Sequence, residues 1–126
     1  MDKIIINSYI KYDPLHENNL DEVLNLIQEI REKFPEKTIW LYTGYEWSKI
    51  MNTIIMQPVF SCKDLEKRIE FHLQRQNIIK LCDIVVDGEY IDEQNDVTLK
   101  WRGSKNQQVI DVKQSLAQNK IVLYCD

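Results

Sequence analysis

The chain has 126 residues, of which 44% are apolar and 29% are charged. This length and composition are typical of one globular domain and argue against a disordered chain. Its 16 lysines and arginines are outnumbered by 20 aspartates and glutamates, so the formal charge of −4 offers no general attraction for a nucleic-acid backbone. No apolar run approaches the roughly 20 residues of a membrane-spanning helix, and the amino terminus is unlike a signal peptide. We therefore expect a cytoplasmic protein that binds neither membranes nor, directly, nucleic acid.

The first strand and the first helix are predicted from the amino-terminal third of the chain. Residues 4–10 form an apolar run that is typical of a buried strand. Asn19, with Glu22 three residues later, predicts a capping box at the start of a helix, which Pro35 would end. The apolar residues of this helix recur at helical spacing and predict one buried face, formed by Leu20, Val23, Leu24, Ile27, Ile30 and Phe34.

The middle of the chain predicts a second strand and two further helices. The β-branched and aromatic residues 38–43 indicate the strand, and residues 46–56 indicate a short helix. Ser61 and Asp64 form a second capping-box pattern, from which a helix would run to Lys80. The inner face of that helix is expected to carry Leu65, Ile69 and Leu73.

The carboxyl-terminal third predicts two more strands. Residues 83–86 indicate the third strand and residues 121–124 the last one, with a loop over 89–108 and a helix near 111–118 between them. Strands that alternate with helices imply right-handed crossovers and a mainly parallel sheet. We therefore predict an α/β fold in which a small open sheet of about four strands is flanked by helices.

The thiols and imidazoles form no recognisable metal site. Cys62, Cys82 and Cys125 are too widely spaced for a CxxC motif, and we expect them to be reduced core residues. His16 and His72, the only histidines, have no cysteine or carboxylate partner at metal-ligand spacing. The sequence therefore predicts no metal centre.

The segment from Lys11 to Pro14 lies at the corner between the first strand and the first helix, where α/β proteins commonly hold a ligand. A backbone that approaches a phosphate or a cofactor closely needs glycine at such a corner. This chain instead has Lys11 and Tyr12 ahead of Asp13 and Pro14. Either nothing small binds here, or a former binding site has been lost.

A second candidate site lies in the expected loop over residues 89–108. An arginine and a serine around a glycine can bind a carboxylate or a phosphate through the guanidinium and backbone N–H groups. Tryptophan and arginine are also enriched among interface hot spots. The structural alternative is that Trp101 packs back on the sheet while Arg102 pairs with Asp87 or Asp111. The candidates for partner binding are Lys100, Trp101, Arg102, Gly103, Ser104 and Lys105.

Four stretches of the sequence carry a resemblance to a known family: DPLHENNLDEVLNLIQEI, FPEKTIWLYTGYEW, CDIVVDGEYIDE and TLKWRGSKNQQVIDVKQSLAQNKIVLYCD. Over residues 9–126 the chain resembles the C-terminal half of the activating protein of the anaerobic, class III ribonucleoside-triphosphate reductase. That family belongs to the radical S-adenosylmethionine enzymes. The resemblance implies a partial radical-SAM barrel as the fold and the reductase as the protein partner.

The chain departs from this family at the residues that the family's reaction needs. Family members hold a [4Fe–4S] cluster with a Cys-x3-Cys-x2-Cys motif, which this sequence does not contain. They also carry a glycine pair where the backbone meets the methionine end of S-adenosylmethionine, and Lys11 and Tyr12 occupy those positions here. A segment of extra length, about residues 54–73, is a further difference. We therefore predict a single truncated radical-SAM-like domain over residues 1–126, with no catalytic residues, no cofactor and no metal.

Three functions are compatible with this resemblance and its departures. The first is a non-catalytic protein that binds the class III reductase as a regulator or inhibitor. The second is a phage or mobile-element inhibitor of a host defence protein, of the anti-CRISPR type, since an acidic surface would suit a basic target. The third is one half of a split activase whose cysteine motif lies on another chain. The sequence favours the first.

Overall fold

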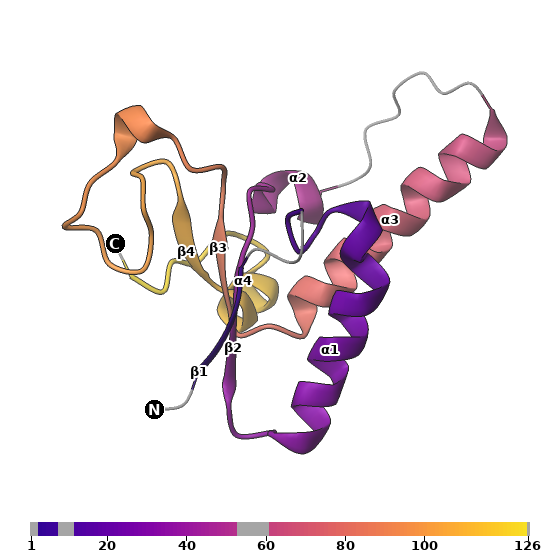
Figure 1. Cartoon of the computed structure of the whole chain (residues 1–126), viewed down its shortest axis with the longest axis horizontal. Helices are drawn as coiled ribbons and strands as arrows, with labels where there is room; N and C mark the ends of the chain where they lie inside the picture. The colour runs from indigo at the N-terminus through magenta and orange to yellow at the C-terminus, as the bar shows by residue number, and fades with distance from the viewer. Residues whose placement is uncertain (1–2, 8–11, 53–60, 126) are drawn as a thin grey trace.

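Figure 1 shows the computed structural model of the chain, which describes residues 3–7, 12–52 and 61–125. The elements in chain order are β1 (Lys3–Ile6), the 3₁₀ turn η1 (Glu17–Asn19), α1 (Leu20–Lys33), β2 (Thr38–Tyr42), α2 (Trp47–Met51), α3 (Cys62–Lys80), β3 (Ile84–Asp87), the 3₁₀ turn η2 (Asp92–Gln94), β4 (Gln108–Asp111) and α4 (Val112–Gln118). Within the described part of the chain, no helix combines the length and the apolar character needed to cross a membrane.

The four strands form one open sheet in the order β1-β2-β3-β4. β1 pairs with β2 and β2 pairs with β3 in parallel, whereas β4 runs antiparallel to β3. In the register of the sheet, Trp40 lies between Ile5 of β1 and Ile84 of β3. The predicted α/β fold, with an open and mainly parallel sheet of four strands, is therefore confirmed.

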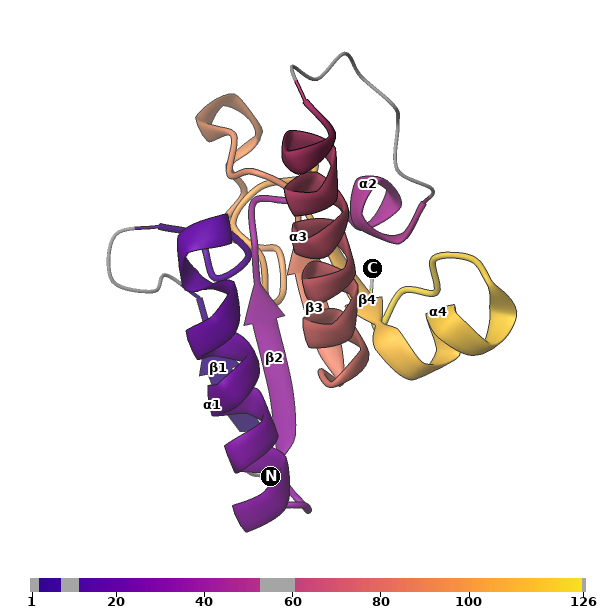
Figure 2. The same ribbon diagram turned by 90° about the vertical axis from the view of Figure 1, so that its right-hand side faces the viewer.

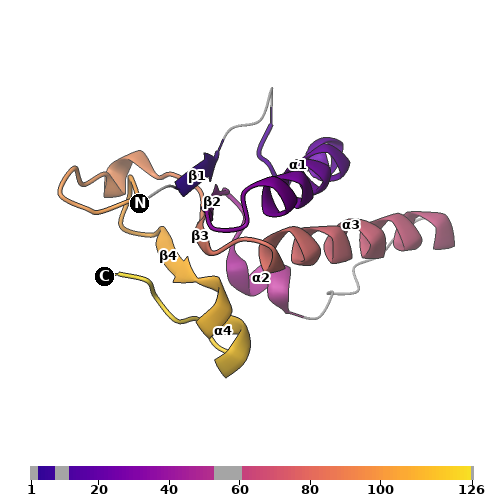
Figure 3. The ribbon, with the colours of Figure 1, turned by 90° about the horizontal axis from the view of Figure 1, so that it is seen from below.

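Helices α1 and α3 cover one face of the sheet, as the views in Figures 2 and 3 show. Side chains alternate across a strand, so Ile39 and Leu41 of β2 point to the helices while Trp40 points to the other face. The main core fills the helical side, and its largest fully buried members are Leu15, Leu20, Ile27, Ile39, Leu41, Ile78, Ile79 and Ile110. Arg75 of α3 connects this layer to the segment before η1, because its Nε donates a hydrogen bond to the Leu15 carbonyl at 2.7 Å.

The other face of the sheet carries a smaller apolar cluster and no helix among the described residues. Its buried members are Trp40, Ile84, Val86 and Val109. The segment between β3 and β4 and the carboxyl-terminal tail reach this side, as Figure 1 shows. Two of their rings pack against Trp40, namely Trp101 at a centroid distance of 5.3 Å and Tyr124 at 5.4 Å.

The fourth strand is not the one that the sequence predicted. β4 lies at the end of the expected loop, whereas residues 121–124 contribute only an isolated bridge between Ile110 and Leu123. The prediction was wrong because it followed the longer β-branched run. Val109 and Ile110 are fully buried, while Leu123 and Tyr124 remain 45% and 49% exposed, so burial favours the shorter apolar segment as the strand.

The starts of the two long helices were predicted with unequal success. Ser61 caps α3 as expected, since its Oγ accepts a hydrogen bond from the Asp64 N–H at 3.2 Å. Asn19 does not cap α1, because its side chain donates instead to the backbone carbonyls of Tyr12 and Asp13, at 3.4 and 3.1 Å. Asn19 therefore holds the preceding corner rather than the first turn of the helix.

The predicted inner face of α3 was also wrong. Ile69 and Leu73 are 37% and 52% exposed, because α3 packs on the core through other residues, namely Phe71, Ile78 and Ile79. The helix instead buries residues of its second half, Ile78 and Ile79. The predictions for residues 8–10 of the first strand and for residues 53–56 of the short helix lie outside the described residues.

Candidate functional site

The carboxyl ends of the three parallel strands meet at one edge of the sheet, where a hollow of about 300 Å³ opens. α/β proteins commonly place ligand-binding groups at this edge. The hollow is lined by the predicted corner residues Asp13 and Pro14 and by the ends of the neighbouring strands, namely Asn7, Tyr42, Thr43, Gly44, Gly88, Glu89, Tyr90 and Gln107. Lys11 lies outside the described residues.

Asp13 joins the corner to the end of β2. Its Oδ1 accepts hydrogen bonds from the Thr43 hydroxyl at 2.7 Å and from the Leu15 N–H at 2.9 Å. Its Oδ2 accepts from the Gly44 N–H at 2.5 Å, and a Cβ added to Gly44 would lie 3.4 Å from that oxygen. The Asp13 carboxylate is thus used inside the protein, where it accepts hydrogen bonds from three donors.

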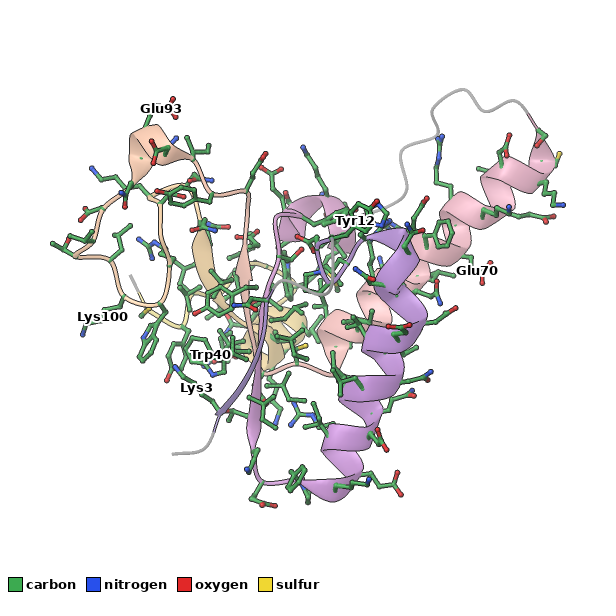
Figure 4. The ribbon with its side chains drawn as sticks, viewed as in Figure 1. Lys3, Tyr12, Trp40, Glu70, Glu93 and Lys100 are labelled. Carbon is green, nitrogen blue, oxygen red and sulfur yellow. The ribbon has the colours of Figure 1, made fainter. Side chains whose placement is uncertain are left out.

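The remainder of the corner is filled by side chains. The buried Asn19 side chain donates hydrogen bonds to the carbonyls of Tyr12 and Asp13. Tyr12 is 47% exposed, and its ring stacks on His16 at a centroid distance of 4.3 Å, beside the start of α1 in Figure 4. A tyrosine–histidine stack therefore stands where a ligand-binding corner would present bare backbone.

Asp87 performs a similar structural role at the end of β3. It is 4% exposed, and its carboxylate accepts hydrogen bonds from the N–H groups of Trp47 at 2.7 Å and Gln108 at 3.2 Å. Burial raises the pKa of Asp87 above its usual range, although these N–H groups partly oppose the shift. Asp87 therefore links the start of α2 and the start of β4 to the central strands.

The raised pKa of Asp87 makes stability depend on pH in a defined direction. Because the folded-state pKa exceeds the unfolded value near 3.8, the contribution of the neutral carboxyl is complete below that value. It is lost as pH rises through the folded-state pKa. The quantity to compare is the unfolding free energy of wild type minus that of Asp87→Asn. We expect this difference to fall as pH rises from the unfolded-state pKa to the folded-state pKa, by about 1.4 kcal/mol for each unit between the two pKa values.

Denaturant titrations of both proteins over a series of pH values measure this difference. The other carboxyl groups are common to the two proteins and cancel. A difference that grows as pH rises above 3.8 would contradict the assigned direction.

The Gln107 side chain stabilises the loop between β3 and β4 by hydrogen bonds to its backbone. Its Oε1 accepts from the N–H groups of Gly103 and Ser104, at 3.0 and 3.1 Å. Ser104 is fully buried, and its hydroxyl donates to Asn106 Oδ1 at 2.6 Å. These two N–H groups are therefore already paired with a side chain of the same loop, and binding of an anion through the guanidinium and other N–H groups stays a prediction.

The structure agrees with the structural alternative for Trp101 but not for Arg102. Trp101 does pack back on the sheet, against Trp40, with 46% of its surface exposed and with a left-handed φ of 68°. Arg102 does not pair with Asp87 or Asp111, and its buried Nε meets no hydrogen-bond acceptor among the described residues. Lys100 and Lys105 are exposed. The loop therefore exposes Lys100 and Lys105, whereas Arg102 is partly buried.

The three thiols lie in different environments. Cys62 is exposed at the start of α3, and Cys125 is half-buried in the tail. Cys82 is buried, its Sγ donates to the Ile78 carbonyl at 3.3 Å, and burial raises the pKa of this thiol to about 12. Within residues 3–7, 12–52 and 61–125, no three His, Cys, Asp or Glu side chains are grouped as metal ligands would be.

Comparison with known families gives a match over most of this architecture. A family model described as a 4Fe-4S single cluster domain matches residues 12–110. The chain belongs to this family. The match begins at the corner and ends in β4, so it includes Asp13, Asp87 and the whole loop between β3 and β4.

Curated relatives of this 4Fe-4S single cluster domain protein are anaerobic ribonucleoside-triphosphate reductase-activating proteins. Identity is 35% over 95 residues with the protein of Vibrio cholerae, covering 75% of this chain and 48% of the relative. It is 33% over 97 residues with that of Escherichia coli K12, covering 77% and 49%. It is 37% over 98 residues with that of Enterobacteria phage T4, covering 77% and 47%. The chain thus spans about half the length of the curated relatives it matches. No solved structure matches it significantly.

The side chains of this 4Fe-4S single cluster domain do not fit the cluster for which the family is named. Cluster iron is held by several converging thiolates, as a rule four. Here Cys82 is protonated because of its high pKa and donates to a carbonyl, whereas Cys62 is the first residue of α3, the helix that ends at Lys80, and Cys125 lies in the tail. The thiols of this chain therefore do not converge on one metal site.

Sequence reasoning missed two residues that organise the site, Lys3 and Gln107. The Lys3 ammonium lies 3.4 Å from the centroid of the Trp101 ring and 4.1 Å from that of Trp40. Gln107 supplies the acceptor that fixes the loop. A lysine at the first position of a strand is an ordinary surface residue by pattern, so only the position of Trp101 reveals its contact.

Proposed function

We propose that this chain is a non-catalytic relative of the activating proteins, and that it binds the anaerobic ribonucleoside-triphosphate reductase as a regulator or inhibitor in the cytoplasm. The relatives' names supply the partner, since they are called activators of that reductase. The observation that carries the non-catalytic part is the state of the thiols, which do not converge and of which Cys82 is held protonated in the core. A chain without cluster ligands has no means of its own to deliver the electron that radical formation needs.

The proposed contact surface is the exposed part of the loop between β3 and β4. Lys100, Trp101, Arg102 and Lys105 combine one half-exposed aromatic ring with three cationic side chains. Gly103 and Ser104, which belonged to the predicted set, support this surface through their bonds to Gln107. Aromatic and arginine side chains on a fixed backbone are the usual anchors of protein interfaces.

Titration calorimetry under anaerobic conditions, with the purified chain and the purified reductase, tests the proposal. We expect a saturable complex. We also expect the chain to stay colourless after incubation with iron and sulfide, and the reductase to acquire no glycyl-radical signal when S-adenosylmethionine and a reductant are added. Stoichiometric iron on the chain, or a radical formed with it as the sole activator, would overturn the non-catalytic reading.

The same experiment separates the two alternatives. The family includes a phage member, which is the observation in favour of a phage inhibitor of a host defence protein. A reductase that gives no binding heat would leave that alternative ahead. A radical that appears only when a second, cysteine-bearing chain is added would instead support a split activase.

A further inference from the structure

A second hollow, of about 430 Å³, opens on the helix-free face of the sheet. It lies at the amino ends of the parallel strands, opposite to the edge that holds Asp13, because Lys3 begins β1 and Ile84 begins β3. Its volume is in the range of pockets that hold small molecules or single side chains. Neither the corner nor the family match explains it.

The walls of this hollow are aromatic and apolar. Trp40 forms the floor and is 4% exposed, with the edge of Tyr124 against it at an interplanar angle of 80°. Trp101 and Tyr124 form the rim, where each keeps almost half of its surface exposed. Exposed apolar surface continues outside the rim at Ile5, which pairs with Trp40 in the register and is 48% exposed.

Two lysines make the hollow electrostatically positive. The Lys3 ammonium lies over the Trp40 and Trp101 rings, as Figure 4 shows for Lys3 and Trp40, and Lys113 also lines the hollow. In the described part of the chain, neither lysine has a carboxylate within 4.0 Å.

The carboxylates that line the hollow are already engaged. Asp83 pairs with Arg31 at 2.7 Å and accepts from the Ile39 N–H at 2.8 Å. Asp111 caps α4 by accepting from the Gln114 N–H at 3.0 Å. Because Arg31 balances Asp83, the two lysines outnumber the one remaining carboxylate among the described residues that line the hollow.

We propose that this hollow receives a segment of the protein partner in which a carboxylate stands beside an aromatic or branched apolar side chain. The apolar group would pack against Trp40 and Tyr124, and the carboxylate would pair with Lys3 and Lys113. Charge-assisted hydrogen bonds to a carboxylate are stronger than the contacts that Lys3 makes with the two rings. The hollow is continuous with the proposed interface, because Trp101 belongs to both. This inference deepens the proposed function and rests on it.

The fluorescent probe 8-anilinonaphthalene-1-sulfonate, an anion on an aromatic body, tests the chemistry of the hollow. We expect saturable binding that weakens at least tenfold in the double variant Lys3→Gln with Lys113→Gln. The uncharged probe N-phenyl-1-naphthylamine should bind both proteins equally. Lys63→Gln with Lys120→Gln removes two exposed lysines elsewhere and should leave both probes unaffected. If Lys3→Gln impairs folding, Lys113→Gln alone, at an exposed position, is expected to weaken anionic binding about threefold.

Equal affinity of the sulfonate for wild type and for a folded lysine variant would overturn the proposed charge preference. The source of the natural group is tested by adding the reductase to the probe-loaded chain, and we expect the probe to be released. A complex that forms while the probe stays bound would overturn this inference and leave the proposed function intact. Absence of any complex would overturn the proposed function and with it the reductase as source, while the lysine dependence of probe binding would still be measured.

Discussion

Replacement of Arg31 by alanine is expected to lower the free energy of unfolding by about 3 kcal/mol. Its guanidinium donates to the Leu81 carbonyl from Nε at 2.9 Å and from a terminal nitrogen at 2.6 Å. It also donates to the Lys37 carbonyl at 3.2 Å and pairs with Asp83 Oδ2 at 2.7 Å. The pair is mostly buried, with side-chain exposures of 26% and 18%. Removal of Arg31 takes this donor from the Leu81 and Lys37 carbonyls and leaves the Asp83 carboxylate with the Ile39 N–H but without its cation.

Denaturant unfolding measures this loss, and Lys33→Ala provides a matched control on the same helix. Lys33 pairs with Glu29 at 3.4 Å, but both side chains are more than 60% exposed. Its removal should therefore change stability by less than about 0.5 kcal/mol. Arg31→Ala should cost less in an Asp83→Asn background, where no carboxylate charge is stranded. Equal losses for Arg31→Ala and Lys33→Ala would show that the buried pair contributes nothing particular.

The double variant Arg102→Ala with Lys105→Ala is expected to weaken binding of the reductase by about 2 kcal/mol, or roughly 30-fold. Its melting temperature should stay close to that of wild type, because Lys105 is exposed and the buried Nε of Arg102 has no acceptor to lose. Calorimetric titration of the reductase and a thermal melt give the two readouts.

Two exposed lysines outside the loop, Lys63 and Lys120, supply the charge-matched control for this variant. Their replacement by alanine should leave reductase affinity within about twofold, because general attraction between charges in salt solution is screened. A folded loop variant with unaltered affinity would remove Arg102 and Lys105 from the contact surface. A loop variant whose melting temperature falls sharply would show that the loop has a structural role instead.

The parts of the fold that sequence periodicity predicts well are those whose burial is uniform along the element. β2 and β3 are apolar runs that remain buried, and α1 keeps Leu20, Val23 and Ile27 in the core as predicted, whereas Phe34, predicted on the same face, lies past the end of the helix and is 43% exposed. The helix α3 shows the limit of this reasoning. Its apolar residues at helical spacing, Ile69 and Leu73, are 37% and 52% exposed, whereas Phe71, Ile78 and Ile79 of the same helix pack on the core. Spacing predicts a face, but tertiary contact decides whether that face is buried.

The candidate sites themselves stay predictions. The corner at Asp13 and the loop at Trp101 both line hollows, but no observed ligand or partner tests what they bind. The hydrogen bonds from the loop N–H groups to Gln107 were not predictable, because the sequence does not show where the side chain of a glutamine four residues away will point. The contact of Lys3 with Trp101 joins opposite ends of the chain and likewise leaves no local pattern.

The strand order β1-β2-β3-β4 repeats the order of the strands along the chain. No strand has to enter between two that have already paired, so the sheet can grow at one edge as each strand emerges during synthesis. Each closure then bridges only one intervening connection, and loop-closure entropy increases slowly with the length of such connections. β4 comes last and runs antiparallel, and the tail crosses its outer side through the bridge of Leu123 to Ile110. The edge of the sheet at β4 is therefore partly covered by residues that follow α4 in the chain.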